Sequence, residues 1–211
     1  MSQLPAEPFT LHGGCDCTAI RYTISAPALE YRPVQSDKHS KGEDVRPPKI
    51  FFDHCNKCRR VSGAIVQAWL SCPQEWLEWS VGSTGPLPSE EKVRTWVTTS
   101  TKDVVKSVPG ASPVANYGSS PGVTRTFCGR CGTNLAYVYA GREETNPTPM
   151  IDIVLGSLDT ESLEMEGMRP DRHFYWESGV TWVKDLVAEG DKSLVGEKLP
   201  RHPDGSRLET C

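Results

Sequence analysis

Six of the eight cysteines stand in three close pairs, and this spacing is the strongest chemical signal in the sequence. The pairs are Cys15 and Cys17 in C-D-C, then C-N-K-C at 55–58 and C-G-R-C at 128–131. Cysteines this close along the chain seldom meet the torsion that a disulfide requires. A C-x-x-C redox pair would need a thioredoxin-like βαβ setting, of which the surrounding residues show no sign. Metal binding is the interpretation that uses all three pairs.

The spacing suits zinc. Two thiolates at positions i and i+3 of a tight turn can both reach one ion at roughly 2.3 Å. In C-G-R-C-G, Gly129 and Gly132 give the turn its conformational freedom. Cys15 and Cys17 would share one face of a strand, since residues i and i+2 point to the same side. The alternating apolar residues at 20–24 favour such a strand.

The number of ligands allows two kinds of site. A closed structural zinc takes four protein ligands, whereas a catalytic zinc takes three and leaves a position open. Six thiolates complete one four-thiolate site and leave two sulfurs over. Asp53 precedes Cys55 by two residues, so Asp53, Cys55 and Cys58 can form a three-ligand site. Spacing alone decides neither which two pairs share the closed site nor whether His54 completes a second closed one.

Polar residues next to the middle pair are candidates for substrate binding. Arg59 and Arg60 follow a cysteine directly, and they would form either an electropositive mouth for an anionic substrate or ordinary solvated charge. Ser62 and Gly63 would present backbone N–H groups to a substrate oxygen or simply form a tight turn. His173 fits a satisfied core histidine better than a proton relay.

The order of the three cysteine blocks resembles the glutathione-dependent formaldehyde-activating family. That family includes the domain of centromere protein V and has the Mss4-like zinc fold. Three stretches carry the resemblance, namely G-C-D-C at 14–17, D-H-C-N-K-C-R-R-V-S-G-A at 53–64 and R-T-F-C-G-R-C-G-T-N-L at 125–135. Weaker matches at 156–159, at 173–174 and at Trp182 extend the resemblance over roughly residues 10–187.

The resemblance implies which cysteines act together. It assigns a structural zinc to the first and last pairs, Cys15, Cys17, Cys128 and Cys131. It assigns a catalytic zinc to a C-x-C-x-x-C block, which here reads Asp53, Cys55 and Cys58. The aspartate departs from the family pattern. A carboxylate is a harder zinc ligand than a thiolate, so the ion would be a stronger Lewis acid and less firmly held. The same carboxylate could instead act as a base.

The resemblance also implies an activity. We expect a zinc-dependent carbon–sulfur lyase that acts on adducts between a glutathione-like thiol and a carbonyl compound. The alternative is a non-catalytic Mss4-like binding or chaperone module, because a fold does not fix a function. The expected partner is a small-molecule thiol or carbonyl adduct, and a homodimer is possible.

These sites require a scaffold of short strands. The 18 glycines and 17 prolines favour many turns, and we expect a single mainly-β domain of short, curled antiparallel sheets braced by zinc, with long loops. Strands are expected within 10–31 and at 50–52, 93–99, 124–127, 135–139 and 150–155, with a strand or a buried run at 64–70 and a loop at 104–122. Residues 1–9 would be a flexible leader, 10–187 the zinc domain with an exposed insertion at 32–49, and 188–211 a polar tail.

Composition argues against other functional classes. The net charge of −4 disfavours nucleic-acid binding, including the chromatin role that centromere protein V suggests. No stretch approaches the roughly 20 apolar residues of a membrane span, so no membrane partner is expected. The N-terminus has neither the basic nor the apolar region of a secretory signal. We therefore expect a cytoplasmic protein with reduced thiols.

Overall fold

The structure is a computed structural model that describes residues 4–36, 44–82, 95–107, 110, 112–141 and 147–190. The predicted tail beyond residue 190, part of the predicted insertion, part of the expected 93–99 strand and Cys211 lie outside these residues.

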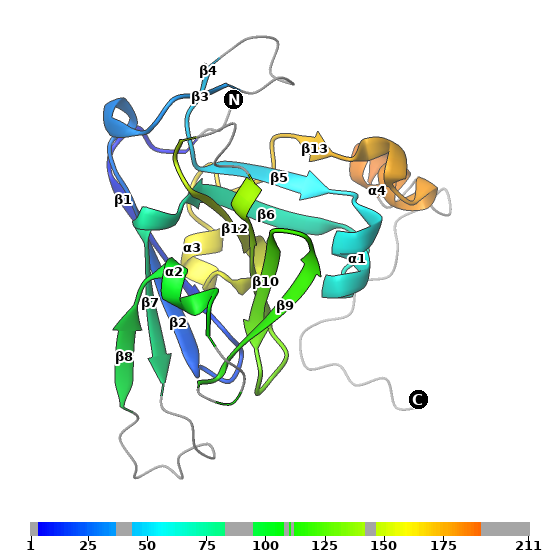
Figure 1. The fold of residues 1–211 in the computed structure, drawn as a ribbon. Helices are drawn as coiled ribbons and strands as arrows, with labels where there is room; N and C mark the ends of the chain where they lie inside the picture. The colour runs from blue at the N-terminus through cyan, green and yellow to red at the C-terminus, as the bar shows by residue number, and fades with distance from the viewer. Residues whose placement is uncertain are drawn as a thin grey trace, which may run out of the picture.

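Two β-sheets pack against each other and enclose the main core (Figure 1). The first has the strand order β1-β2-β7-β8, the second the order β13-β5-β6-β12-β11-β10-β9, and β3 and β4 form a small separate pair. The named strands pair antiparallel, except for the parallel pair of β13 with β5. The prediction of a mainly-β fold is confirmed. The strands are β1 Phe9–Gly14, β2 Ile20–Ala26, β3 Gln35–Ser36, β4 Asp44–Val45, β5 Lys49–Asp53, β6 Gln67–Pro73, β7 Leu77–Gly82, β8 Trp96–Thr99, β9 Val114–Ser120, β10 Val123–Cys128, β11 Asn134–Tyr139, β12 Met150–Val154 and β13 His173–Phe174.

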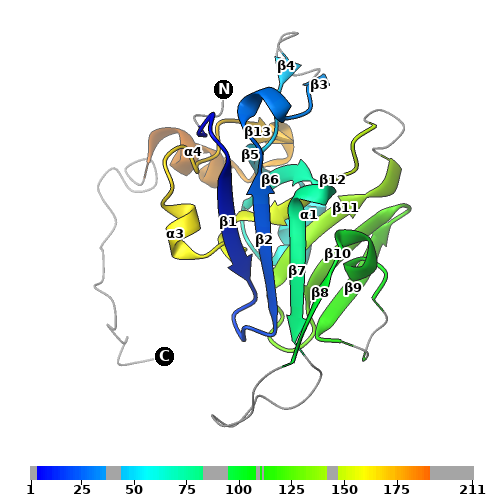
Figure 2. The ribbon, with the colours of Figure 1, turned by 90° about the vertical axis from the view of Figure 1, so that its left-hand side faces the viewer.

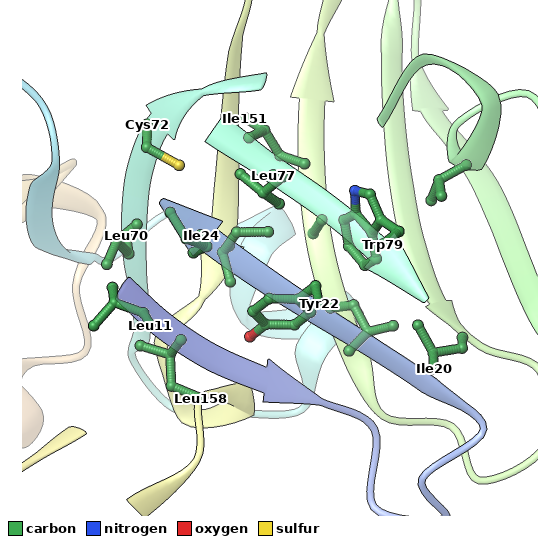
Figure 3. Close-up of a cluster of buried hydrophobic side chains, with 14 of the residues drawn as sticks. Leu11, Ile20, Tyr22, Ile24, Leu70, Cys72, Leu77, Trp79, Ile151 and Leu158 are labelled. Atoms are coloured by element: carbon green, nitrogen blue, oxygen red, sulfur yellow. The ribbon is translucent and has the colours of Figure 1, made fainter. Parts of the chain in front are cut away.

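The core between the sheets follows from period-2 alternation. Along β2 every second side chain is buried, beginning at Ile20, and Tyr22 and Trp79 are among the largest buried side chains. Figure 3 shows these residues facing Leu70 and Ile151 of the other sheet. Each such side chain contributes about 1.5–3 kcal/mol on burial. Figure 2 shows the first sheet covering the second from one side.

The helices are short and sit at the ends and edges of the sheets. They are α1 Asn56–Ser62, α2 Thr101–Val104, α3 Thr160–Leu163 and α4 Thr181–Glu189, with 3-10 turns η1 Leu29–Tyr31, η2 Gln74–Trp76, η4 Leu155–Ser157 and η5 Trp176–Ser178. Helix α1 carries Cys58 onto the outer face of the second sheet, against Phe51 and Trp69. It ends at Gly63, whose φ of 74° places it in the left-handed region that glycine tolerates.

Two local predictions differ from the structure. The expected loop at 104–122 is wrong, because Val114–Ser120 forms strand β9 on β10. Its sequence, V-A-N-Y-G-S-S, lacks the alternation that marks a strand, and pairing with β10 supplies the order instead. The strand expected at 64–70 begins three residues later and runs on to Pro73.

The segments at both ends of the first hairpin are tied together. The guanidinium of Arg32, in the predicted insertion, is buried and donates hydrogen bonds to the carbonyl oxygens of Pro5, Glu7 and Pro27. Residues 5–7 of the predicted leader therefore contact the start of the insertion. Within the described residues, no helix has the length and apolar character to cross a membrane.

Glycine at position 13 is required by packing. A Cβ there would lie 2.4 Å from the hydroxyl of Tyr22 and 2.6 Å from the carbonyl oxygen of Ser157. We expect Gly13→Ala to lower the free energy of unfolding by about 1–3 kcal/mol, as overpacking does. Urea denaturation measures it. Gly118→Ala, with no heavy atom near the added Cβ, is the control and should leave stability within about 1 kcal/mol of wild type. Equal losses in both variants would contradict the packing argument.

Candidate metal centres

Four cysteines from the two ends of the fold meet in one cluster. Cys15 and Cys17 follow β1, Cys128 is the last residue of β10, and Cys131 lies in the turn after it. Their sulfurs lie within 4.8 Å of one another, with 3.6 Å from Cys15 to Cys17 and 3.7 Å from Cys17 to Cys128. A zinc ion with four sulfurs at 2.3 Å requires tetrahedral edges of about 3.8 Å. The donor set therefore fits zinc.

The surroundings of this cluster provide hydrogen bonds to sulfur. The backbone N–H of Ile20 donates to Cys15 Sγ at 3.2 Å, and the hydroxyl of Thr133 lies 3.1 Å from Cys131 Sγ. Burial raises the pKa of Cys15 and of Cys128. At Cys131 burial also raises the pKa, but hydrogen bonds involving Thr133 and Cys17 outweigh it and the pKa falls to about 6. Buried thiols of raised pKa ionise when a cation compensates their charge, as zinc does.

The middle block forms a second cluster where β5 of the second sheet ends. Asp53 ends β5, Cys55 immediately precedes α1 and Cys58 lies in its first turn (Figure 1). One carboxylate oxygen and the two sulfurs lie within 4.8 Å of one another. The three residues expected from the spacing are thus together, and this carboxylate and thiolate set also suits zinc. His54 does not belong to the cluster.

The carboxylate of Asp53 is held at both oxygens. Its Oδ1 accepts a hydrogen bond from the backbone N–H of Cys55 at 2.8 Å, and its Oδ2 accepts one from Trp69 Nε1 at 3.1 Å. Asp53 is 6% exposed. Carboxylates that bind metals are oriented by hydrogen bonds of this kind. The arrangement therefore favours a fixed ligand over a mobile base.

Arg125 also lies next to the middle cluster, and the sequence patterns did not identify it as a site residue. It is buried, its Nη2 lies 3.4 Å from Cys58 Sγ and its Nε donates to Ser119 Oγ at 3.0 Å. Its guanidinium lies 4.9 Å from the ring centre of Tyr137. Burial and Asp53 raise the pKa of Cys58, and Arg125 opposes them. Two thiolates and a carboxylate exceed the charge of a divalent ion by one, which this cation balances.

His54 points to a different group of side chains. Its Nε2 lies 3.0 Å from Nδ1 of His173, and both rings pack edge-on to Trp176. Partial desolvation of the imidazole rings lowers the pKa of both histidines. At His54 the charges of His173 and Lys184 lower the pKa further, whereas Asp53 raises it. Both shifts favour the uncharged form of the rings. His173 is exposed on β13, whereas a core position was expected.

A cavity of about 380 Å³ lies near the middle cluster, although Asp53, Cys55 and Cys58 do not line it. Gln67, one of its lining residues, pairs with Asp53 across β5 and β6. Ser62 also lines it, whereas Arg59, Arg60 and Gly63 do not. Arg60 is exposed on α1. The lining residues are Ser62, Ala64, Val66, Gln67, Ala68, Thr133, Asn134, Val154, Gly156 and Ser157.

The fold and the two clusters together define a mainly-β protein with two candidate zinc sites, one closed by four thiolates and one with three ligands beside a cavity. The family model described as glutathione-dependent formaldehyde-activating enzyme matches residues 39–178. The chain belongs to this family. The first cysteine pair precedes the matched residues but completes the four-thiolate cluster.

Comparisons with individual proteins add little. No curated protein matches the chain. A crystal structure of a Rhodobacter sphaeroides protein is 10% identical, with a TM-score of 0.39, and the match covers 78% of this chain and 100% of the other.

The two hydrogen bonds to Asp53 predict the effect of an amide at this position. In Asp53→Asn the NH₂ group would face one of the two N–H donors, leaving that donor unpaired in the interior. We expect the free energy of unfolding to fall by about 1–3 kcal/mol in urea denaturation. Asp159→Asn is the control, because its ion pair with Arg21 is about one-third exposed and should contribute less than about 1 kcal/mol. A loss at Asp53 no larger than at Asp159 would show that these hydrogen bonds do not hold the carboxylate.

Proposed function

We propose that the chain is a zinc-dependent carbon–sulfur lyase that forms and cleaves the adduct between a glutathione-like thiol and formaldehyde or a related carbonyl compound. The observation that carries the proposal is the cluster of Asp53, Cys55 and Cys58, with three ligand atoms beside a cavity. Three protein ligands and room for a small molecule are the requirements of a catalytic zinc site. Family membership supports the same chemistry.

The proposed reaction is a reversible addition. The thiol sulfur forms a bond to the carbonyl carbon, the carbon–oxygen π bond breaks, and the thiol proton ends on the new hydroxyl oxygen. A zinc ion bound to the cluster would supply Lewis acidity to a sulfur or an oxygen of the substrate. No oxidant or reductant is needed.

The residues of the chain hold the site in place for this chemistry. Asp53 is fixed by Trp69 and the Cys55 amide, so the ligand set is preorganised. Arg125 lies against Cys58 and offsets the surplus negative charge. Phe51 and Trp69 bury the inner side of Cys58, which limits access to the cluster from within the sheet.

The four-thiolate cluster has a structural role in this proposal. Its members join the first hairpin to the turn after β10, and metal binding there adds folding free energy. None of the seven described cysteines forms a disulfide, which suits work in a reducing compartment such as the cytoplasm.

Metal content tests the two sites. We expect about two zinc ions per purified chain, and Cys55→Ser should lose about one while the fold survives. Cys72→Ala is the matched control, since Cys72 is fully buried on β6 and belongs to neither cluster. Elemental analysis of each variant, with its thermal midpoint, gives the result. If the Cys55→Ser protein keeps the full zinc content, the three-ligand cluster does not bind zinc.

Catalysis is tested separately. With ¹³C-formaldehyde and glutathione, the wild-type protein should accelerate exchange between free and thiol-bound formaldehyde, as exchange NMR measures it. Cys55→Ser should fall to the rate without protein, and Cys72→Ala should match wild type. Wild-type exchange no faster than the uncatalysed rate, in protein holding both ions, refutes the lyase proposal for this substrate.

A further inference from the structure

None of the candidate metal ligands lines the cavity, but two of its lining residues contact residues of the two clusters. Ser62 follows Cys58 by one helical turn, and its hydroxyl donates to the Cys58 carbonyl at 2.9 Å. On the opposite side, Thr133 contacts Cys131 Sγ. A ligand that reaches the three-ligand site through this cavity must therefore satisfy its lining residues.

Every side chain that lines the cavity is uncharged. The side chains of Ala64, Val66, Ala68 and Val154 are apolar, and the polar ones carry only hydroxyls and carboxamides. Such a lining does not compensate a carboxylate or an ammonium group, whose burial without a partner is strongly unfavourable. The part of a ligand that enters the cavity must be neutral.

The hydroxyl groups of the lining already have partners. Ser62 Oγ also accepts from the backbone N–H of Ala64, and Ser157 Oγ donates to the Val154 carbonyl and lies 2.7 Å from the Tyr22 hydroxyl. Thr133 Oγ1 accepts from the backbone N–H of Asp16 at 3.1 Å. The two carboxamides therefore hold the unused hydrogen-bonding capacity.

Asn134 and Gln67 have complementary unused groups. The buried Nδ2 of Asn134 has no acceptor among the described residues. Gln67 is 3% exposed and its Nε2 donates to the Ala68 carbonyl at 2.8 Å, which leaves Oε1 as an acceptor. For comparison, both ends of the Asn116 side-chain amide are paired, because it donates to the Val104 carbonyl and accepts from the Thr126 hydroxyl. The cavity thus combines one spare donor with one spare acceptor.

We propose that this cavity binds a secondary amide of the thiol substrate, with Asn134 donating to the amide carbonyl and Gln67 accepting from the amide N–H. The inference rests on the proposed function and specifies its substrate class. A secondary amide is neutral and offers one acceptor and one donor, which matches the lining. The charged ends of a thiol peptide then stay outside the cavity.

Two neutral thiols that differ in one group test the proposal. N-acetylcysteamine carries the amide, and 2-mercaptoethyl acetate replaces its N–H by an ester oxygen. We expect zinc-loaded wild-type protein to bind the amide about tenfold more tightly, since the ester leaves the Gln67 oxygen unpaired. NMR titration gives both dissociation constants. Equal affinities would overturn the proposal.

Variants assign the two roles. Gln67→Leu should weaken amide binding about tenfold and abolish the preference over the ester, whereas Asn134→Leu should weaken both probes and keep the preference. Gln74→Leu is the control, because the amide of Gln74 donates to the Met150 carbonyl away from the cavity, and both affinities should stay as in wild type. Thermal midpoints report folding, and Asn134→Ser replaces Asn134→Leu if the latter does not fold. A preference that survives in Gln67→Leu would overturn the assignment.

The outcomes separate this inference from the proposed function. Accelerated formaldehyde exchange with no preference for the amide leaves the lyase standing and removes the amide pocket. A preference for the amide without accelerated exchange keeps the pocket as a binding site and removes the lyase.

Discussion

The outer face of the second sheet depends on the carboxylate of Asp53, which links three elements. It ends β5, accepts a hydrogen bond from Cys55 immediately before α1, and accepts another from Trp69 on β6. These contacts fix where α1 starts and so where Cys58 lies. In this position a cysteine would offer a sulfur to a metal but weaker hydrogen bonds to the two donors. The aspartate therefore provides both a ligand and a structural link.

Two buried arginines, Arg32 and Arg125, are stabilised in different ways. Arg32 spreads its hydrogen bonds over three backbone carbonyls and lies over Phe9, a purely structural arrangement. Arg125 contacts one hydroxyl, one sulfur and an aromatic ring, and its Nη1 has no partner among the described residues. A guanidinium buried with so few acceptors needs a nearby negative charge. The cluster of the middle block supplies that charge, which explains why a cation lies there.

The sequence allowed good predictions where chemistry is local. Ligand spacing within each cysteine block, and alternation along 20–24, depend on a few neighbouring residues, so the three members of the middle cluster and strand β2 could be predicted. The grouping of the first cysteine pair with the last followed only from the family resemblance. The contacts of Trp69 and Arg125 with the middle cluster could not be predicted, because cross-strand neighbours depend on the register of β5, β6 and β10. Helix α1 was missed because seven residues give too short a periodic signal. Strand β9 was missed because its order comes from its partner and not from its own side chains.

The four-thiolate cluster joins positions 111 residues apart, as between Cys17 and Cys128. A ribosome delivers the first hairpin long before the last cysteine pair, so the nascent chain must bring distant segments together before this clamp can close. Zinc binding after the last cysteine pair has been synthesised, rather than formation of the first hairpin, would therefore determine when folding is complete.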